Sequence, residues 1–322
     1  MLADKPRVAI VGAGAIGGYY GCLLARAGCD VHFLLRGDYD AVMQRGFTVR
    51  RPDESFTLYP VQGYQNPQDI GPCDLVIVAL KSTANRHLHK LVAPLVGGHT
   101  LVLTLQNGMG NAEALAEFVP AVQILGGLCF VCLNRVEPGV IECYMPGRIF
   151  IGEFMGSYRQ RTIEVVELFE RAGVQAYFSR SLDESLWRKL VWNIPFNGLT
   201  IAAGGVATDR IVQSEHFTQL ARLLMREVQA AARAHGHYIP DDFLESQIEE
   251  TRAMDAYKPS SMLDYVAGRE VEVESIFGEP LRRGMSKSVV MPRLETLYYL
   301  LKGLCPPPAK DGHGKSKHRK KA

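Results

Sequence analysis

Three glycines near the start of the chain have the spacing of a pyrophosphate-binding turn. The predicted turn consists of Gly12, Gly14, Ala15, Ile16 and Gly17, in the pattern GxGxxG. It joins an apolar strand at residues 8–11 to a helix over residues 15–27. In such a turn the first glycine permits the bend, the second lets backbone approach the phosphates, and the third lets helix and strand pack closely. Because the helix would also direct its N-terminal amides at an anion, we predict a dinucleotide site.

A second group of polar side chains could act on a substrate. Lys189, Asn193 and Asn197 recur at steps of four in a segment that is otherwise apolar nearly all round. On an α-helix they form one stripe, and burying an ammonium and two amides is costly unless they are paired or face a ligand. Pro195 should kink this helix beside the stripe. The competing interpretation is a core helix whose lysine reaches solvent and whose amides bond carbonyls.

The residue after the second predicted strand indicates which dinucleotide is bound. That strand covers residues 30–35 and is followed by Arg36. NAD sites usually carry an acid here to accept from the ribose 2′-hydroxyl, whereas a guanidinium suits the 2′-phosphate of NADP. Arg36 therefore favours NADP(H). Asp38 lies close enough to support NAD instead, and a solvated surface arginine is the third interpretation.

The elements that must position these residues begin as alternating strands and helices. Two further apolar strands, at residues 73–80 and 99–105, end at Lys81 and just before Asn107. Ligands bind at the carboxyl ends of strands in open parallel sheets, so both side chains are candidates for the site. The Asn107 amide could reach a nicotinamide ribose or a substrate carbonyl, so it is a candidate for cofactor and for substrate binding. Turn chemistry is an equal alternative, because Asn107 precedes a glycine.

The alternation stops near residue 179, after strands at residues 125–133, 139–144 and 148–152 and a helix over 157–172. Beyond it the predicted helices cover residues 183–203, 214–234, 240–253, 260–267, 271–284 and 292–304. We predict an α/β fold with an N-terminal Rossmann-type parallel-sheet domain and a C-terminal all-helical domain. The predicted boundaries are 1–180 for the NADP-binding domain, 181–308 for the helical substrate and catalytic domain, and 309–322 for a disordered basic tail.

Composition narrows the class of protein. A chain of 322 residues with 47% hydrophobic residues suits two ordinary domains. The tail carries six lysines and arginines against one aspartate, while the whole chain has a net charge of +2. The body is therefore slightly acidic and gives no reason to expect nucleic acid. The tail is interpreted as a solubilising end, with nuclear localisation or binding to an anionic surface as the alternative.

Cysteine usage and the absence of targeting signals suggest a cytoplasmic protein. The opening residues run straight into the first strand, and no apolar run reaches membrane-spanning length. Most of the seven cysteines lie in apolar segments, as buried thiols would. Cys129 and Cys132 form a C-x-x-C within a strand-like run, where their side chains should alternate, so we interpret them as core residues. The nine histidines show no metal-ligand spacing, and we predict no metal.

In its motifs the chain resembles the ketopantoate reductase (2-dehydropantoate 2-reductase) family. The likeness runs nearly end to end. Its motifs are GxGxxGGYYG at the start, K-S-T at 81–83, Q-N-G-M-G at 106–110, W-R-K-L-V-W-N-I-P-F-N at 187–197, S-S-M-L-D…G-R-x-x-E at 260–272 and P-R-L-E-T-L-Y at 292–298. Each piece alone is common, whereas the combination is specific.

The resemblance implies a role for each matching position. Lys189 would protonate the ketone oxygen, and Glu272 would accept a hydrogen bond from a substrate hydroxyl. The other implied site residues are Asn193 and Asn197 with Ser260 or Ser261 at the substrate, and Asn107 and Lys81 on the nicotinamide side. The spacing to Glu272 favours Ser260, and the Ser-Met pair favours Ser261. Lys258-Pro259 replaces the Asn or Thr that members often have here, which leaves the exact keto acid open.

The expected function is cytosolic reduction of 2-dehydropantoate to (R)-pantoate by NADPH, in pantothenate and coenzyme A synthesis. One alternative is a β-hydroxyacid dehydrogenase-like enzyme that acts on another 2-keto or 3-hydroxy acid. The other is a non-catalytic NADP(H)-sensing protein. The expected partner is a small 2-keto acid, with no nucleic acid and no membrane. A homodimer is compatible with the sequence, which does not fix the oligomeric state.

Overall fold

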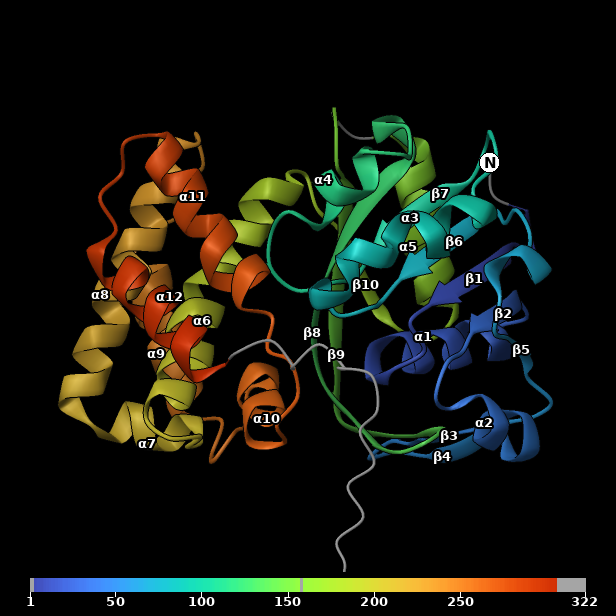
Figure 1. Ribbon diagram of the computed structural model, residues 1–322, viewed down its shortest axis with the longest axis horizontal. Coiled ribbons are helices and arrows are strands. Elements are labelled where there is room, and N and C mark those ends of the chain that lie inside the picture. The colour runs from blue at the N-terminus through green and yellow to red at the C-terminus, as the bar shows by residue number, and fades with distance from the viewer. Residues whose placement is uncertain (1–2, 157–158, 306–322) are drawn as a thin grey trace, which may run out of the picture.

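A parallel sheet and a helical bundle lie side by side in the computed structural model, which describes residues 3–156 and 159–305 (Figure 1). The predicted fold class is confirmed. The predicted tail, residues 309–322, lies outside the described residues. The strands are β1 (Arg7–Val11), β2 (Asp30–Leu34), β3 (Phe47–Arg50), β4 (Ser55–Leu58), β5 (Gln62–Tyr64), β6 (Leu75–Val78), β7 (Leu101–Thr104), β8 (Ile124–Glu137), β9 (Val140–Glu153) and β10 (Gln175–Phe178).

The sheet is parallel in its centre and antiparallel at two pairs, β3 with β4 and β8 with β9. The order is β4-β3-β9-β8-β7-β6-β1-β2-β5, and β10 also pairs with β9. Strands β2, β1, β6, β7 and the start of β8 run parallel, as expected for short apolar runs buried on both faces. Their carboxyl ends therefore lie along one edge, which faces the helical region.

The long hairpin of β8 and β9 differs from the prediction of separate strands at 139–144 and 148–152. Strand β9 runs without a break from Val140 to Glu153, with Pro146 and Gly147 inside it. The pairing with β8 shifts register between Phe130 and Cys132, opposite this dipeptide, and Gly147 has φ of +55°. A β-bulge thus accommodates a residue without an amide proton and a glycine in the left-handed region, which a turn prediction does not foresee.

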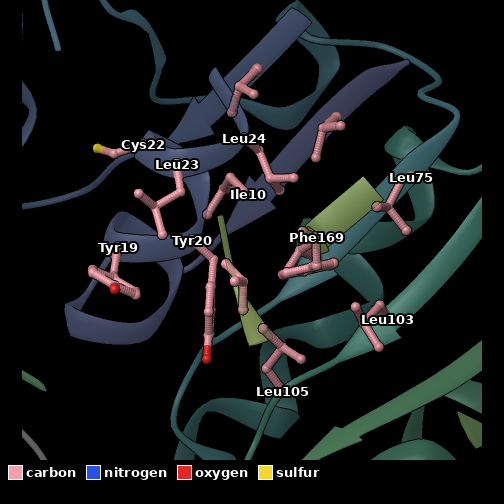
Figure 2. Packing of buried hydrophobic residues seen from close by; sticks show 14 of the residues in the cluster. Ile10, Tyr19, Tyr20, Cys22, Leu23, Leu24, Leu75, Leu103, Leu105 and Phe169 are labelled. Carbon is pink, nitrogen blue, oxygen red and sulfur yellow. The ribbon is translucent and has the colours of Figure 1, made fainter. Parts of the chain in front are cut away.

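Helices cover both faces of the sheet. They are α1 (Ala15–Arg26), α2 (Tyr39–Arg45), α3 (Leu88–Val92), α4 (Asn111–Ala116) and α5 (Gln160–Arg171). Side chains of α1 and α5 fill one core with Ile10, Leu75 and Leu103, and Figure 2 shows Tyr20 and Phe169 within it. Helix α3 is flanked by two 3-10 turns, Ser82–His87 and Ala93–Leu95.

The helical region packs around α6 (Leu182–Ala202), which is buried nearly all round as predicted and continues through Pro195. The surrounding helices are α7 (Thr208–Gln213), α8 (Glu215–Ala234), α9 (Asp241–Arg252), α10 (Ser260–Val266), the π-helix Glu274–Gly278, α11 (Glu279–Ser286) and α12 (Pro292–Leu304). Figure 1 shows α6 and α10 on the side of the bundle that faces the sheet. They carry the polar side chains that the sequence singles out.

Candidate active site

The glycine-rich turn has the geometry of a phosphate cradle. Gly12 has φ of +98°, and a Cβ there would lie 2.7 Å from the Leu80 amide nitrogen. A Cβ on Gly17 would overlap the Gly12 carbonyl oxygen, whereas a Cβ on Gly14 would meet no atom within 4 Å. Ala15 and Ile16 open α1, whose first turn has no acidic residue and no side-chain cap. Open space above Gly14 and uncapped amides fit a dinucleotide pyrophosphate.

The side chain at the end of β2 also fits a phosphate. The Arg36 side chain is exposed and makes no hydrogen bond or ion pair with any described residue. Asp38, the feature that favours NAD, has both carboxylate oxygens bound by Arg135 Nη1, at 2.7 and 2.8 Å. Its carboxylate is therefore engaged elsewhere, and the guanidinium of Arg36 remains available for an anion.

Lys189 connects the two regions of the protein. Its Nζ donates to the Asn107 side-chain oxygen and to the Cys129 carbonyl oxygen, both at 3.0 Å. Burial lowers the pKa of Lys189, while Cys129 and Glu272 act in the opposite direction. A lysine held this way can donate a proton near neutral pH more readily than a solvated one.

The amides of α6 face the start of α10. Asn197 donates to the Asn193 carbonyl oxygen at 3.0 Å and accepts from the Ser261 backbone amide at 3.2 Å. Ser261 is 2% exposed, and its hydroxyl has no partner among the described residues, whereas Ser260 is exposed. Of the two candidate serines, Ser261 is the one that lies against the amide stripe with an unused hydroxyl.

Glu272 is buried against the end of β6. It is 6% exposed, and its Oε1 accepts from the Ser82 amide at 2.7 Å. Burial raises the pKa of Glu272, and the hydrogen bond from Ser82 and the charge of Lys81 oppose that shift. A buried carboxylate with one oxygen held by the protein leaves the other for a ligand donor.

Lys81 contacts a residue that sequence reasoning missed. Its ammonium is bound to the buried carboxylate of Asp264 in α10, which also accepts from Arg269 at 2.8 Å. The nicotinamide-side role of Lys81 stays a prediction. The sequence signal was the position of Asp264 on the buried side of a predicted amphipathic helix. A buried carboxylate requires cationic partners, so this position indicates that a lysine or arginine lies beside it.

The turn after β7 fixes Asn107 by docking on the helical region. The Met109 amide donates to the Ser275 carbonyl oxygen at 2.8 Å. Gly108 has φ of +81°, and a Cβ there would overlap the same carbonyl oxygen. Turn chemistry and the site are therefore not alternatives here, since the turn that glycine permits is what presents Asn107 to Lys189.

Replacing Gly108 by alanine should disrupt the contact between the turn after β7 and Ser275 of the helical region. We expect a loss of stability of about 1–3 kcal/mol, from left-handed backbone and from the overlap with Ser275, together with lower turnover as Asn107 shifts. Thermal and urea unfolding would measure the first effect. Gly110→Ala is the matched control, because Gly110 has φ of +86° but its Cβ would lie 3.5 Å from the nearest atom, in Glu279. Equal losses in the two variants would attribute the effect to backbone strain alone.

The cysteine pair does not form an activated redox site. Cys129 and Cys132 are half-buried, and burial raises the pKa of both thiols, that of Cys129 to about 11. Cys129 packs against the core of the sheet region, whereas Cys132 belongs to no core cluster of the described residues, so the prediction of core residues is wrong for Cys132. Among the described residues no group of three or more His, Cys, Asp and Glu side chains could hold a metal ion. No helix in the described part of the chain is long and apolar enough to cross a membrane.

Comparison with known proteins gives consistent matches over both regions. Residues 8–156 match the family model described as "Ketopantoate reductase PanE/ApbA", and residues 181–304 match the model of its C-terminal part. The 2-dehydropantoate 2-reductase of Nostoc sp. is 41% identical over 306 residues, which cover 94% of this chain and 96% of that protein.

Solved structures share the fold over the same length. The crystal structure of 2-dehydropantoate 2-reductase from Geobacter metallireducens has a TM-score of 0.90 and 45% identity, and covers 92% of this chain and 99% of that one. A D-mandelate dehydrogenase with NADH and anilino(oxo)acetate has a TM-score of 0.85 at 20% identity, over 92% of this chain and 98% of that one. The second likeness shows the fold alone.

Proposed function

The chain belongs to the ketopantoate reductase family, and from that premise we propose that it reduces 2-dehydropantoate to (R)-pantoate with NADPH. This is one step of pantothenate and coenzyme A synthesis. The observation that carries the proposal is the position of Lys189. Its ammonium reaches the carboxyl edge of the sheet at Asn107. The glycine-rich turn follows β1 at the same edge, and Ser82, which binds Glu272, follows β6 there.

Lys189 is the group that handles the proton in this proposal. Reduced nicotinamide, when bound, supplies the hydride. As negative charge grows on the ketone oxygen, the Lys189 ammonium stabilises it and then donates a proton to it. Its hydrogen bonds to Asn107 and to the Cys129 carbonyl hold the Nζ atom in place beforehand, so little reorganisation is needed during the reaction.

The remaining residues orient the keto acid. Asn193, Asn197 and the unused hydroxyl of Ser261 supply neutral donors and acceptors for the substrate carboxylate and carbonyl. Glu272 supplies a carboxylate for the hydroxyl of 2-dehydropantoate, with its other oxygen held by Ser82. This division of roles predicts that Glu272 reads a feature that simple 2-keto acids lack.

A panel of 2-keto acids would test the function directly. The purified protein with NADPH should oxidise the cofactor fastest with 2-dehydropantoate, followed by absorbance, and the product should be the (R) enantiomer by chiral chromatography. Preference for another keto or hydroxy acid would support the β-hydroxyacid dehydrogenase-like alternative. NADPH binding without oxidation by any acid in the panel would support the sensing alternative.

Arg36→Ala should weaken discrimination between the two nicotinamide cofactors. A guanidinium on the 2′-phosphate contributes about 1.5–3 kcal/mol, so the NADPH-over-NADH ratio of kcat/KM should fall roughly ten- to a hundredfold. Arg45→Ala is the control, since it removes an equally exposed arginine at the far end of α2. An unchanged ratio in Arg36→Ala would remove Arg36 from the cofactor site.

A further inference from the structure

An acidic residue lies two positions after the arginine that we assign to the 2′-phosphate. A carboxylate at the end of this strand is the usual acceptor for the ribose hydroxyl of NAD, and its charge disfavours a phosphate nearby. Asp38 should therefore oppose Arg36 in choosing NADP. In the structure, however, the Asp38 carboxylate is bound by another residue and is not free to accept from the ribose hydroxyl.

Arg135 holds Asp38 from the hairpin of β8 and β9. Its Nη1 donates to both carboxylate oxygens, and the Gly139 amide adds a bond at 3.3 Å. Asp38 occupies the residue before α2, where an aspartate usually caps the helix, but its side chain makes no hydrogen bond to the α2 amides. Its side chain is 16% exposed, so its charge is largely enclosed by the hairpin.

We propose that Arg135 is a positioning residue that sets the preference for NADPH by binding and neutralising Asp38. Arg36 is then the uncompensated charge that a 2′-phosphate meets at this edge. The proposal rests on the proposed use of NADPH and extends it to Arg135, which lies 97 positions from Asp38 in the sequence. It requires no direct contact between Arg135 and the cofactor.

Direct contact is the competing explanation. The Arg135 side chain is 43% exposed, and it lines a cavity of about 390 Å³ with Lys258 and Arg269 of the helical region. An arginine in such a place could reach the phosphate itself. The two explanations differ in the effect of removing Arg135 once the charge of Asp38 is gone. Neutralisation predicts no further loss of NADPH preference, whereas direct contact predicts the same loss as before.

A double-mutant cycle decides between them. The dissociation constants of NADPH and NADH are measured by calorimetry, without substrate, for wild type, Arg135→Ala, Asp38→Asn and the double variant. We expect Arg135→Ala to lower the NADPH-over-NADH affinity ratio about two- to fivefold, the scale of an interaction between partly exposed charges. Asp38→Asn should keep or raise the ratio. The double variant should match Asp38→Asn, and Arg135→Lys should restore part of the preference.

Controls separate this effect from general damage to the hairpin. NADH affinity is an internal control, because NADH differs only at the 2′ position. Arg50→Ala removes a comparable ion pair, Arg50 with Glu142 at 3.0 Å, between β3 and β9 and should leave the ratio unchanged. An equal loss from Arg135→Ala in both Asp38 backgrounds, or no loss in either, would overturn the proposal. Equal affinity of wild type for the two cofactors would contradict the proposed use of NADPH itself. If the preference is lost in Arg36→Ala but kept in Arg135→Ala, the use of NADPH stands and only the role of Arg135 is refuted.

Discussion

Lys189→Ala should lower kcat by about 10²–10⁴, the usual contribution of a positioned general acid, while NADPH still binds. The variant removes the ammonium that contacts Asn107 and the Cys129 carbonyl, and nothing else in the described structure supplies a cation at that point. Steady-state kinetics with 2-dehydropantoate would measure the loss, and calorimetry would measure cofactor affinity. If this variant keeps the wild-type kcat, Lys189 is a structural residue and α6 is not the catalytic helix.

The pH profile gives an independent readout of the same group. Reduction needs protonated Lys189, so kcat/KM should fall at high pH, as pH rises through the Lys189 pKa. Because burial lowers that pKa, the fall should begin below the pH at which an ordinary lysine titrates. Lys189→Ala should lose this limb of the profile.

The neighbouring arginine provides a matched control for both measurements. Arg188 lies on another side of α6, where it donates to Glu184 at 2.9 Å and stacks on Phe243. Arg188→Ala also removes one cation from the helix, so it should cost some stability but keep kcat and the pH profile. A comparable kcat loss in Arg188→Ala would attribute the Lys189 effect to damage to the helix.

Local signals in the sequence predicted the elements whose roles are local. The glycine spacing needs only the adjoining strand and helix. The described turn has a positive φ at Gly12, open space at Gly14 and a close backbone approach at Gly17, as the spacing implies. The stripe of Lys189, Asn193 and Asn197 depends only on helical periodicity and lies on α6 as expected. Such features are decided within about ten residues, where pattern and backbone geometry are tightly linked.

Features decided by distant contacts could not be predicted. Whether Asn107 is a turn residue or a site residue depends on Ser275, which receives the turn, and on Lys189. The choice between Ser260 and Ser261 depends on which side of α10 meets Asn197. One residue of helical rotation separates the two serines, and sequence spacing does not fix that rotation.

Glu272→Ala should act on substrate recognition more than on the chemical step. Its assigned partner is the hydroxyl of 2-dehydropantoate, which takes no part in hydride or proton transfer. A hydrogen bond to a charged group contributes about 1.5–3 kcal/mol, so KM for 2-dehydropantoate should rise roughly ten- to a hundredfold. A 2-keto acid of similar size without the hydroxyl should be affected much less, and kinetics with the two substrates make the comparison internal.

Two further variants separate charge from packing. Glu272→Gln keeps an oxygen for the Ser82 amide but removes the negative charge, so it should lose substrate preference with less loss of stability than alanine. Glu274→Ala removes an exposed carboxylate two residues along, which pairs with Arg282 and Lys302, and should leave KM unchanged. Equal effects of Glu272→Gln and Glu274→Ala would point to general electrostatics of the region.

The remaining possibility is that Glu272 tunes Lys189 rather than binding substrate. The charge of Glu272 raises the pKa of Lys189 against the effect of burial, so its removal should move the high-pH fall of kcat/KM to lower pH. In that case both substrates would slow equally at neutral pH and recover together at lower pH. If Glu272 binds the hydroxyl, Glu272→Ala should instead impair 2-dehydropantoate much more than the substrate without the hydroxyl. In wild type, KM for 2-dehydropantoate should then rise as pH falls through the raised pKa of Glu272, because the protonated acid is the poorer acceptor.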